Sequence, residues 1–313
     1  MCIRDRSSGI GDGSSDIGND IDTDTSGNTL LVGAFTGSIT IDTITLSTSS
    51  TSASSSFVAK FDQSGDVIWA VDFGESSSSF NQGQGAVAVS VDEATGDIYV
   101  VGDYDASFTL AGSTLPYQGF GTDIYLAKFN SQGVAQWAEG FSGPSNDAPT
   151  DVVFDPLTSS VYVSGESIDS LTIDTTLLVA TATGFLPSFQ FLTKFSSTGQ
   201  FKWAKDFQSG SSGSFFFNNN AGSLAMLTNG DIVLAGAFFV SISLGTQTLS
   251  SSGSFDYEGY LSRFDSSGNV IWAQEIGGVG QDYVRDVAVD QNTNNIWITG
   301  NVDGTATLDT FTC

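Results

Sequence analysis

Residues 61–70 read FDQSGDVIWA, and close copies of this stretch return three times further along the chain. The copies are FNSQGVAQWA (129–138), FSSTGQFKWA (195–204) and FDSSGNVIWA (264–273). Their tryptophans, Trp69, Trp137, Trp203 and Trp272, follow one another at intervals of 68, 66 and 69 residues. A unit of about 67 residues is therefore repeated, and such a fixed period is typical of repeat architectures.

A second marker keeps the same period. Each copy contains a short apolar run that ends in glycine, in the forms LLVG, YVVG, YVSG, VLAG and WITG. The glycines are Gly33, Gly102, Gly165, Gly236 and Gly300. Because neighbouring units of a repeat protein share their cores, these markers predict one continuous array rather than separate domains.

The second copy reads as four strands joined by tight turns. Apolar and polar residues alternate, and turn residues such as Asn, Asp, Ser and Gly separate the runs, as antiparallel hairpins require. The expected strands are GAVAVSVD (85–92), DIYVVGDY (97–104), TDIYLAKF (122–129) and VAQWAEGF (134–141). A variable insert between the second and third strands predicts an extra hairpin, and serine-rich stretches such as 209–220 predict loops.

The predicted fold is therefore all-β. Four antiparallel strands in each tandem unit are typical of the blades of a β-propeller. The blades are expected near 17–73, 84–141, 148–207 and 221–276, with part of a fifth at 283–313. About four and a half blades make an incomplete ring, so we expect the parent ring to be larger.

Both ends of the chain look cut. The opening hexapeptide MCIRDR (1–6) matches the translation of an adapter used in sequencing libraries, so it is excluded from fold reasoning and the repeats occupy 7–313. The last unit, after Gly300, stops partway. We expect an internal fragment, with any signal and sorting segments outside it.

The repeat pattern resembles a known bacterial family. The pattern D-x-F/Y-V/L-A-K-x-D-x-x-G-x-x-x-W-A is carried by Asp123 to Ala138, a G-G-x-x-x-D motif by Gly277, Gly278 and Asp282, and D-x-x-G-N-x-Y-V-x-G by Asp92 to Gly102. It is similar to the SBBP β-propeller repeat. The third copy departs from it, with Ser196 where the others have Asp62, Asn130 and Asp265. The resemblance implies a large secreted or surface-attached protein, as in many Bacteroidota, with no defined catalytic activity.

The net charge of the chain limits the kinds of molecule that it can bind. The 35 acidic residues exceed the nine basic ones and give a net charge of −26, so the chain lacks the basic patch that nucleic acids and anionic membranes require. No apolar run of membrane-spanning length occurs, so no membrane insertion is expected. Cys2 and Cys313 form no readable disulfide framework. The oligomeric state is left open.

The repeated tryptophans and cations are interpreted as structural. We expect each indole to lock one blade against the next, with its N–H bonded to a neighbouring backbone carbonyl; sugar binding by the indoles is the alternative. A cation recurs at one repeat position, in Lys60, Lys128, Lys194 and Arg263. We expect these cations to pair between blades with Asp20, Asp151 and Asp286, with anion binding as the alternative.

Metal and cofactor signals are weak. The run DTDTSGN (22–28) resembles the start of a calcium loop, which makes Asp22 and Asp24 weak calcium candidates. Gly33 stands where an EF-hand would need its twelfth-position Glu, so an Asp that caps the first hairpin turn is the simpler interpretation. No other cofactor is indicated.

The chemistry of the chain favours binding over catalysis. Histidine is absent, which removes the commonest general base, and no carboxylate pair stands out among the many acidic residues. We therefore predict a non-catalytic binding or adhesion module, secreted or on the cell surface, that meets carbohydrate or protein through its rim loops. The alternatives are the propeller part of a polysaccharide-active enzyme and a structural spacer of a large surface protein.

Overall fold

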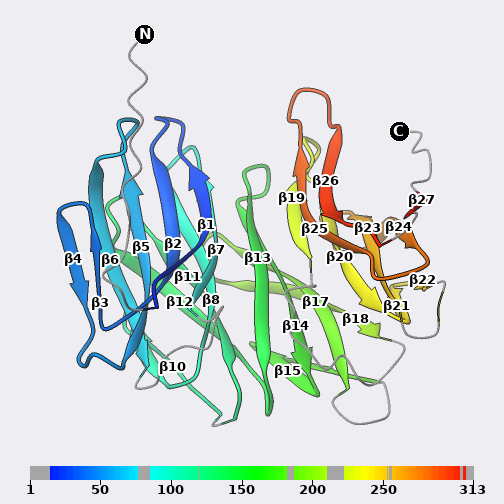
Figure 1. Ribbon diagram of the computed structural model, residues 1–313, viewed down its shortest axis with the longest axis horizontal. Coiled ribbons are helices and arrows are strands. Elements are labelled where there is room, and N and C mark those ends of the chain that lie inside the picture. The colour runs from blue at the N-terminus through cyan, green and yellow to red at the C-terminus, as the bar shows by residue number, and fades with distance from the viewer. Residues whose placement is uncertain are drawn as a thin grey trace. The chain divides into compact units, whose positions relative to one another are not determined.

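The computed structural model describes residues 15–76, 85–118, 120–181, 187–209, 222–251, 253, 256–303 and 306–307. The hexapeptide 1–6, both cysteines and most of the serine-rich loop 209–220 lie outside these residues. The described chain consists of β-strands joined by turns and loops (Figure 1). None of its segments is a helix with the length and apolar character of a membrane span.

The chain forms two compact units. The first comprises residues up to 119 together with 123–140, and the second comprises 120–122 and the residues from 141 onward. Both contain the same element, four antiparallel strands that pair in the order in which they occur along the chain, with the insert strands between the second and the third. The molecule is therefore an all-β protein with repeated four-stranded antiparallel sheets.

The first sheet has the order β1-β2-β5-β6. Its strands are β1 (Ile17–Thr23), β2 (Thr29–Thr36), β5 (Ser54–Phe61) and β6 (Val67–Ser76). The second sheet is built from β7 (Ala86–Asp92), β8 (Asp97–Tyr104), β11 (Asp123–Phe129) and β12 (Ala135–Ser142). These positions confirm the four strands expected in the second copy to within one residue at each end.

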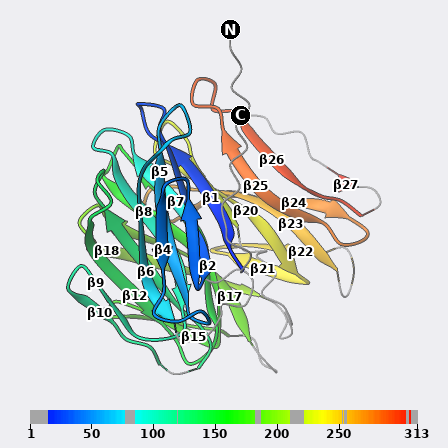
Figure 2. The same cartoon turned by 60° about the vertical axis from the view of Figure 1, so that its left-hand side comes forward.

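The second unit repeats the arrangement twice and adds a further hairpin. One sheet contains β13 (Asp147–Asp155), β14 (Ser160–Ile168), β17 (Ser188–Ser196) and β18 (Phe201–Ser209). The next contains β19 (Ser223–Met226), β20 (Ile232–Phe239), β23 (Tyr257–Phe264) and β24 (Val270–Gly278). The strands β25 (Tyr283–Val289) and β26 (Ile296–Asn301) form the hairpin that Figure 2 shows as a two-stranded ribbon.

The variable inserts form the expected extra hairpins, but their partners were not foreseen. In the second unit, strand β21 of one insert hairpin pairs with β18, the last strand of the preceding sheet. The short strand β27 pairs in the same way with β24, the last strand of the following sheet. The inserts are β3 (Ser38–Ile41) with β4 (Ile44–Ser47), β9 (Phe108–Leu110) with β10 (Ser113–Leu115), β15 (Ser170–Ile173) with β16 (Thr176–Val179), β21 (Ser241–Leu244) with β22 (Gln247–Ser250), and β27 (Ala306–Thr307).

Successive sheets bury their apolar faces against each other within each unit. In the first unit, Val32 and Val58 of one sheet share a core with Val89 and Val100 of the next, and both figures show β1 and β7 side by side. In the second unit an equivalent core joins β14, β17 and β18 to β20, β21 and β23. A sheet that is apolar on both faces needs a neighbour on each side, which explains why the unit is repeated in tandem.

Trp69 and Trp203 each pack on the turn glycine of the next copy. Trp69 donates its indole Nε1–H to the carbonyl oxygen of Ser131 at 3.1 Å, and its ring covers Gly133. A Cβ on Gly133 would lie 2.9 Å from the ring, and its φ of 78° favours glycine independently. Trp203 covers Gly268 in the same way. In the G-x-x-x-W motif, the glycine thus forms a turn, and the tryptophan contacts the corresponding glycine of the next copy.

Replacing Trp69 by alanine tests this contact. We expect the free energy of unfolding to fall by about 2–4 kcal/mol, because a large half-buried ring and its hydrogen bond are both lost. Trp69→Phe should cost less, since it keeps most of the packing and loses the N–H donor. Ile68→Ala, at a neighbouring side chain that is 50% exposed, is the control and should change stability by no more than about 0.5 kcal/mol. Equal denaturation midpoints for Trp69→Ala and the parent chain would refute the assignment.

Candidate binding site

The repeated cations pair within their own sheets. Three ion pairs occur at the same repeat position, Lys60–Asp24 at 2.8 Å, Lys128–Asp97 at 2.7 Å and Arg263–Asp231 at 2.6 Å. For Lys60 and Arg263 the expected pairing between blades, with aspartates such as Asp20 and Asp286, is therefore wrong. The cause is register: Lys60 lies opposite Leu30 on the adjacent strand, and its side chain reaches the hairpin turn that precedes that strand.

The fourth cation has a different environment. The Lys194 ammonium lies 4.7 Å from the centre of the Tyr162 ring and donates a hydrogen bond to the carbonyl oxygen of Ser266 at 3.3 Å. Burial lowers its pKa, and the nearby Asp155 carboxylate opposes this shift. The hydrogen bond to Ser266 belongs to the next copy, so this cation helps to join two sheets of the second unit.

The first-strand aspartates bind adjacent copies, Asp20 and Asp151 through the backbone of the next copy and Asp286 through a side chain of the preceding one. The Asp20 carboxylate accepts the N–H of Val89 at 2.8 Å, and Asp151 accepts that of Leu224 at 2.6 Å. Asp286 accepts a hydrogen bond from the Ser223 hydroxyl at 2.8 Å. Hydrogen bonds from backbone N–H groups to a carboxylate are charge-assisted, so these aspartates stabilise the contact between first strands.

Asp22 and Asp24, the weak calcium candidates, have other contacts. Asp24 accepts backbone N–H groups of Ser26 and Asn28, which makes it the cap of the first hairpin turn. Burial would raise its pKa, but hydrogen bonds from Lys60 and Asn28 outweigh that effect and lower the pKa to about 2. Asp22 accepts the N–H of Val91. No group of three or more potential metal-ligating side chains occurs in the described part of the chain.

The glycine that ends the second strand makes room for the first strand. A Cβ on Gly33 would collide with the carbonyl oxygen of Ile17, and one on Gly102 would collide with that of Gly85. Gly165 and Gly300 have the same relation to Ala148 and Tyr283. With the tryptophans and cations, the repeated positions described so far all serve the architecture. A binding site must therefore be sought where one copy departs from the others.

Such a departure is a row of three aromatic side chains in the second unit. Phe239 at the end of β20 lies 5.0 Å from Tyr257 at the start of β23, measured between ring centres. Tyr257 lies 5.4 Å from Tyr283 at the start of β25, with Arg285 4.7 Å over the outer ring. All three rings are half-buried. They form a continuous aromatic surface where three strands begin or end.

Sequence reasoning missed this row because its members are not repeated. Strand register places Ser54, Thr122 and Ser188 where the fourth copy has Tyr257. Three copies thus carry a small hydroxyl residue at a position where the fourth has a large ring. A search for departures from the repeat would have found the signal, whereas the search for periodic residues passed over it.

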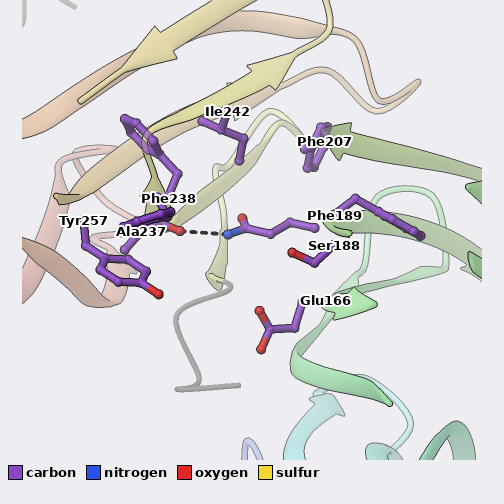
Figure 3. A pocket seen from close by; sticks show the side chains of 10 residues that line it. Glu166, Ser188, Phe189, Phe207, Ala237, Phe238, Ile242 and Tyr257 are labelled. Atoms are coloured by element: carbon purple, nitrogen blue, oxygen red, sulfur yellow. Dashed lines mark hydrogen bonds between the residues drawn. The ribbon is translucent and has the colours of Figure 1, made fainter. Parts of the chain in front are cut away.

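Beside the aromatic row lies a small pocket of about 30 Å³, which has room for a group about the size of a water molecule (Figure 3). Its walls come from β14, β17, β18, β20, β21 and β23, and the rim hairpin contributes Ile242. Gln190 donates a hydrogen bond to the Ala237 carbonyl at 2.8 Å and accepts one from the Tyr260 hydroxyl at 2.6 Å, which fixes its amide. The lining residues are Glu166, Ser188, Phe189, Gln190, Phe207, Ala237, Phe238, Phe239, Ile242 and Tyr257.

Glu166 is the charged group of this pocket. In Figure 3 its carboxylate and the hydroxyl of Tyr257 point toward one another across the open space. Burial raises the pKa of Glu166 to about 7, and no described residue donates a hydrogen bond to the carboxylate. The second copy has Asp103 at the same repeat position, also with a pKa of about 7, but there the backbone N–H of Gly85 binds the carboxylate at 2.7 Å. Glu166 thus faces a pocket, whereas Asp103 is bound by the backbone and buried.

These features define the class of the protein as an all-β repeat protein with four-stranded antiparallel sheets. No protein-family model matches the sequence, and no curated protein does either. Among solved structures, the chain is similar to a catalytically inactive virginiamycin B lyase from Staphylococcus aureus, solved with quinupristin. The alignment covers 87% of this chain and 92% of that chain, with 8% identity and a TM-score of 0.32. A likeness of this degree carries no statement about the site.

A double-mutant cycle on Lys60 and Asp24 tests the intra-sheet pairing. Lys60→Met, Asp24→Asn and the double variant should show a coupling of about 1–3 kcal/mol, because the two side chains are 8% and 9% exposed. Since the pKa of Asp24 lies near 2, below an unfolded value of about 3.9, this stabilisation is present above pH 4 and is lost as the pH falls toward 2. The same cycle on Lys60 and Asp20 should give no coupling, and the reverse pattern would restore the original expectation.

The raised pKa of Glu166 predicts the opposite pH dependence. Between about pH 4.5 and pH 7 the unfolded chain ionises this carboxyl before the folded chain does, so the parent protein loses stability as the pH rises. Glu166→Gln removes the effect, and its stability relative to the parent should improve by about 1–3 kcal/mol between pH 4 and pH 8. Thermal melts across this range provide the measurement. Glu93→Gln, at an exposed glutamate, is the control, and a pH-independent difference for Glu166→Gln would contradict the assignment.

Proposed function

We propose that the repeated sheets are blades of a β-propeller and that the chain is a binding or adhesion module of a secreted or cell-surface protein. The repeated sequence pattern supports the propeller, while the extracellular location rests on the resemblance to the SBBP repeat alone, since no family model matches. The face-to-face burial of successive sheets within each unit supports the propeller as well. The ligand we propose is carbohydrate, bound at the rim of the second unit.

The observation that carries this proposal is the aromatic row Phe239–Tyr257–Tyr283 beside the pocket. Half-buried aromatic rings offer flat apolar surfaces at little cost in conformational entropy, and tyrosine adds a hydroxyl for hydrogen bonding. A pocket with apolar walls and a few fixed polar groups is the usual form of a small-ligand site. The two features together suit a sugar chain that stacks on the rings and places one small substituent in the pocket.

A polysaccharide-active enzyme is the second candidate, and the pKa of Glu166 favours it. A carboxylic acid with a pKa near 7 is suited to general acid catalysis at neutral pH. Glycoside hydrolysis requires a second carboxylate about 5–10 Å away. Among the described residues that line the pocket, Glu166 is the one carboxylate, so binding is the better supported function.

Tyr257→Ala tests the carbohydrate proposal. The parent chain should bind a subset of glycans on an array, and Tyr257→Ala and Tyr283→Ala should each weaken that binding at least about tenfold, since truncation of a central ring commonly costs more than 1 kcal/mol. Phe120→Ala is the matched control, because Phe120 is 79% exposed and lies outside the row. Its affinity should equal that of the parent.

The outcomes distinguish a carbohydrate-binding module, a polysaccharide-active enzyme and a module that binds a protein. Binding that both tyrosine variants lose supports the module, while release of reducing sugar from the bound glycans would identify the enzyme. Absence of binding to any glycan would overturn the carbohydrate proposal. Binding to a purified extracellular protein, lost in Tyr257→Ala, would point to a protein ligand at the same site.

A further inference from the structure

The pocket beside the aromatic row contains a carboxylate without a basic partner. The described lysines and arginines have other contacts: Lys60, Lys128 and Arg263 pair with aspartates, and Lys194 lies against Tyr162. Lys202 bonds to Gln200, Lys205 lines a different hollow, and Arg285 lies over the Tyr283 ring of the aromatic row. None of the described basic residues lines the pocket. A partly buried carboxylate is stabilised best by a cation with hydrogen bonds to its oxygens. In this pocket a ligand would have to supply it.

The other groups of the pocket are also suited to a cation. Its polar side chains offer oxygen acceptors from Glu166 and Ser188, while the amide N–H of Gln190 is committed to the Ala237 carbonyl. A protonated amine has three donors and no acceptor, so it matches such a set. The aromatic walls add electrostatic attraction to a positive charge near their ring faces. The net charge of −26 further favours cationic ligands over anionic ones.

We propose that the pocket binds the protonated amine of an amino sugar, which Glu166 pairs with while the neighbouring sugar residues lie on the aromatic row. The inference rests on the proposed carbohydrate-binding function and specifies its substrate class. Glycans with a free amine are thus preferred over their N-acetylated or neutral counterparts.

The titratable groups that line the pocket predict how binding depends on pH. They are Glu166 from β14 and Tyr257 from β23, with Tyr260 of β23 behind Gln190. The lining residues from β17, β18, β20 and β21 do not titrate. Because the pKa of Glu166 lies near 7, the carboxylate is mostly ionised at pH 8 and mostly protonated at pH 5.5. Affinity for a permanently charged amine should therefore fall with falling pH.

The test is a calorimetric titration of the chain with two trisaccharides, the glucosamine trimer and its fully N-acetylated form. We expect the amine form to bind at least about tenfold more tightly. Glu166→Gln should remove this preference, while Glu93→Gln should retain it. Methylammonium, which stays protonated at these pH values, should compete with the trimer and lose at least about fivefold in affinity between about pH 8 and pH 5.5.

The results distinguish this inference from the proposed function. Equal affinity for the two trimers, or tighter binding of the acetylated form, would overturn the amine site and leave a carbohydrate module intact if Tyr257→Ala still abolishes binding. Failure of every glycan to bind would overturn both. Should Glu166→Gln fold poorly, Ser188→Leu, which narrows the pocket and keeps the charge, must weaken the amine trimer selectively. Binding of Nα-acetyl-lysine amide in place of the trimer would refute the amino sugar and indicate a protein ligand.

Discussion

The structure depends on the burial of one sheet face against the next. A four-stranded sheet with apolar side chains on both faces cannot shelter them alone, so Val32 and Val58 need Val89 and Val100 from the following copy. The indole of Trp69 closes the same contact at its end by packing on Gly133. Because within each unit a copy supplies the surface that its predecessor lacks, the sequence period and the packing period are the same there.

The repeated charged residues have two structural roles: some stabilise a single sheet, and others stabilise the contact between two sheets. Lysine and arginine on the third strand tie the first hairpin turn to the sheet of their own copy, as in Lys60–Asp24. Aspartates on the first strand bind the backbone of the next copy, as Asp20 binds Val89. Much of the repeated charge is therefore occupied by the architecture. This leaves the non-repeated residues as the ones free to differ for function.

Local features of the sequence predicted the strands and the fold well. Contacts between residues far apart in the chain could not be predicted from them. The strands at 97–104 and 123–129 follow from alternation and turn residues, which depend on neighbours in the chain. The partner of Lys60 depends on strand register and side-chain reach, so a pattern that recurs in every copy could not distinguish Asp24 from Asp20. The pairing of β21 with β18 is equally invisible, because the outer edge of a sheet is open to more than one hairpin. Glu166 and the aromatic row could not be predicted in this way, because these residues are not part of the repeated pattern from which the fold was predicted.

One repeat position shows how a residue's surroundings can differ between copies. In the second copy, Asp103 has a backbone N–H from Gly85 within reach and is closed into the interior. In the third copy, Glu166 is one methylene longer and receives no hydrogen bond from the described residues, so its carboxylate faces the pocket. Burial raises the pKa of both carboxyls to about 7, so the shift follows from the position and does not by itself mark function. What sets Glu166 apart is its access to an aromatic pocket formed by the departures of the next copy, since Tyr257 stands where Ser54, Thr122 and Ser188 stand elsewhere. A few changed rim positions in two adjacent copies therefore suffice to form a distinct pocket, while the repeated glycines and paired charges keep their structural contacts.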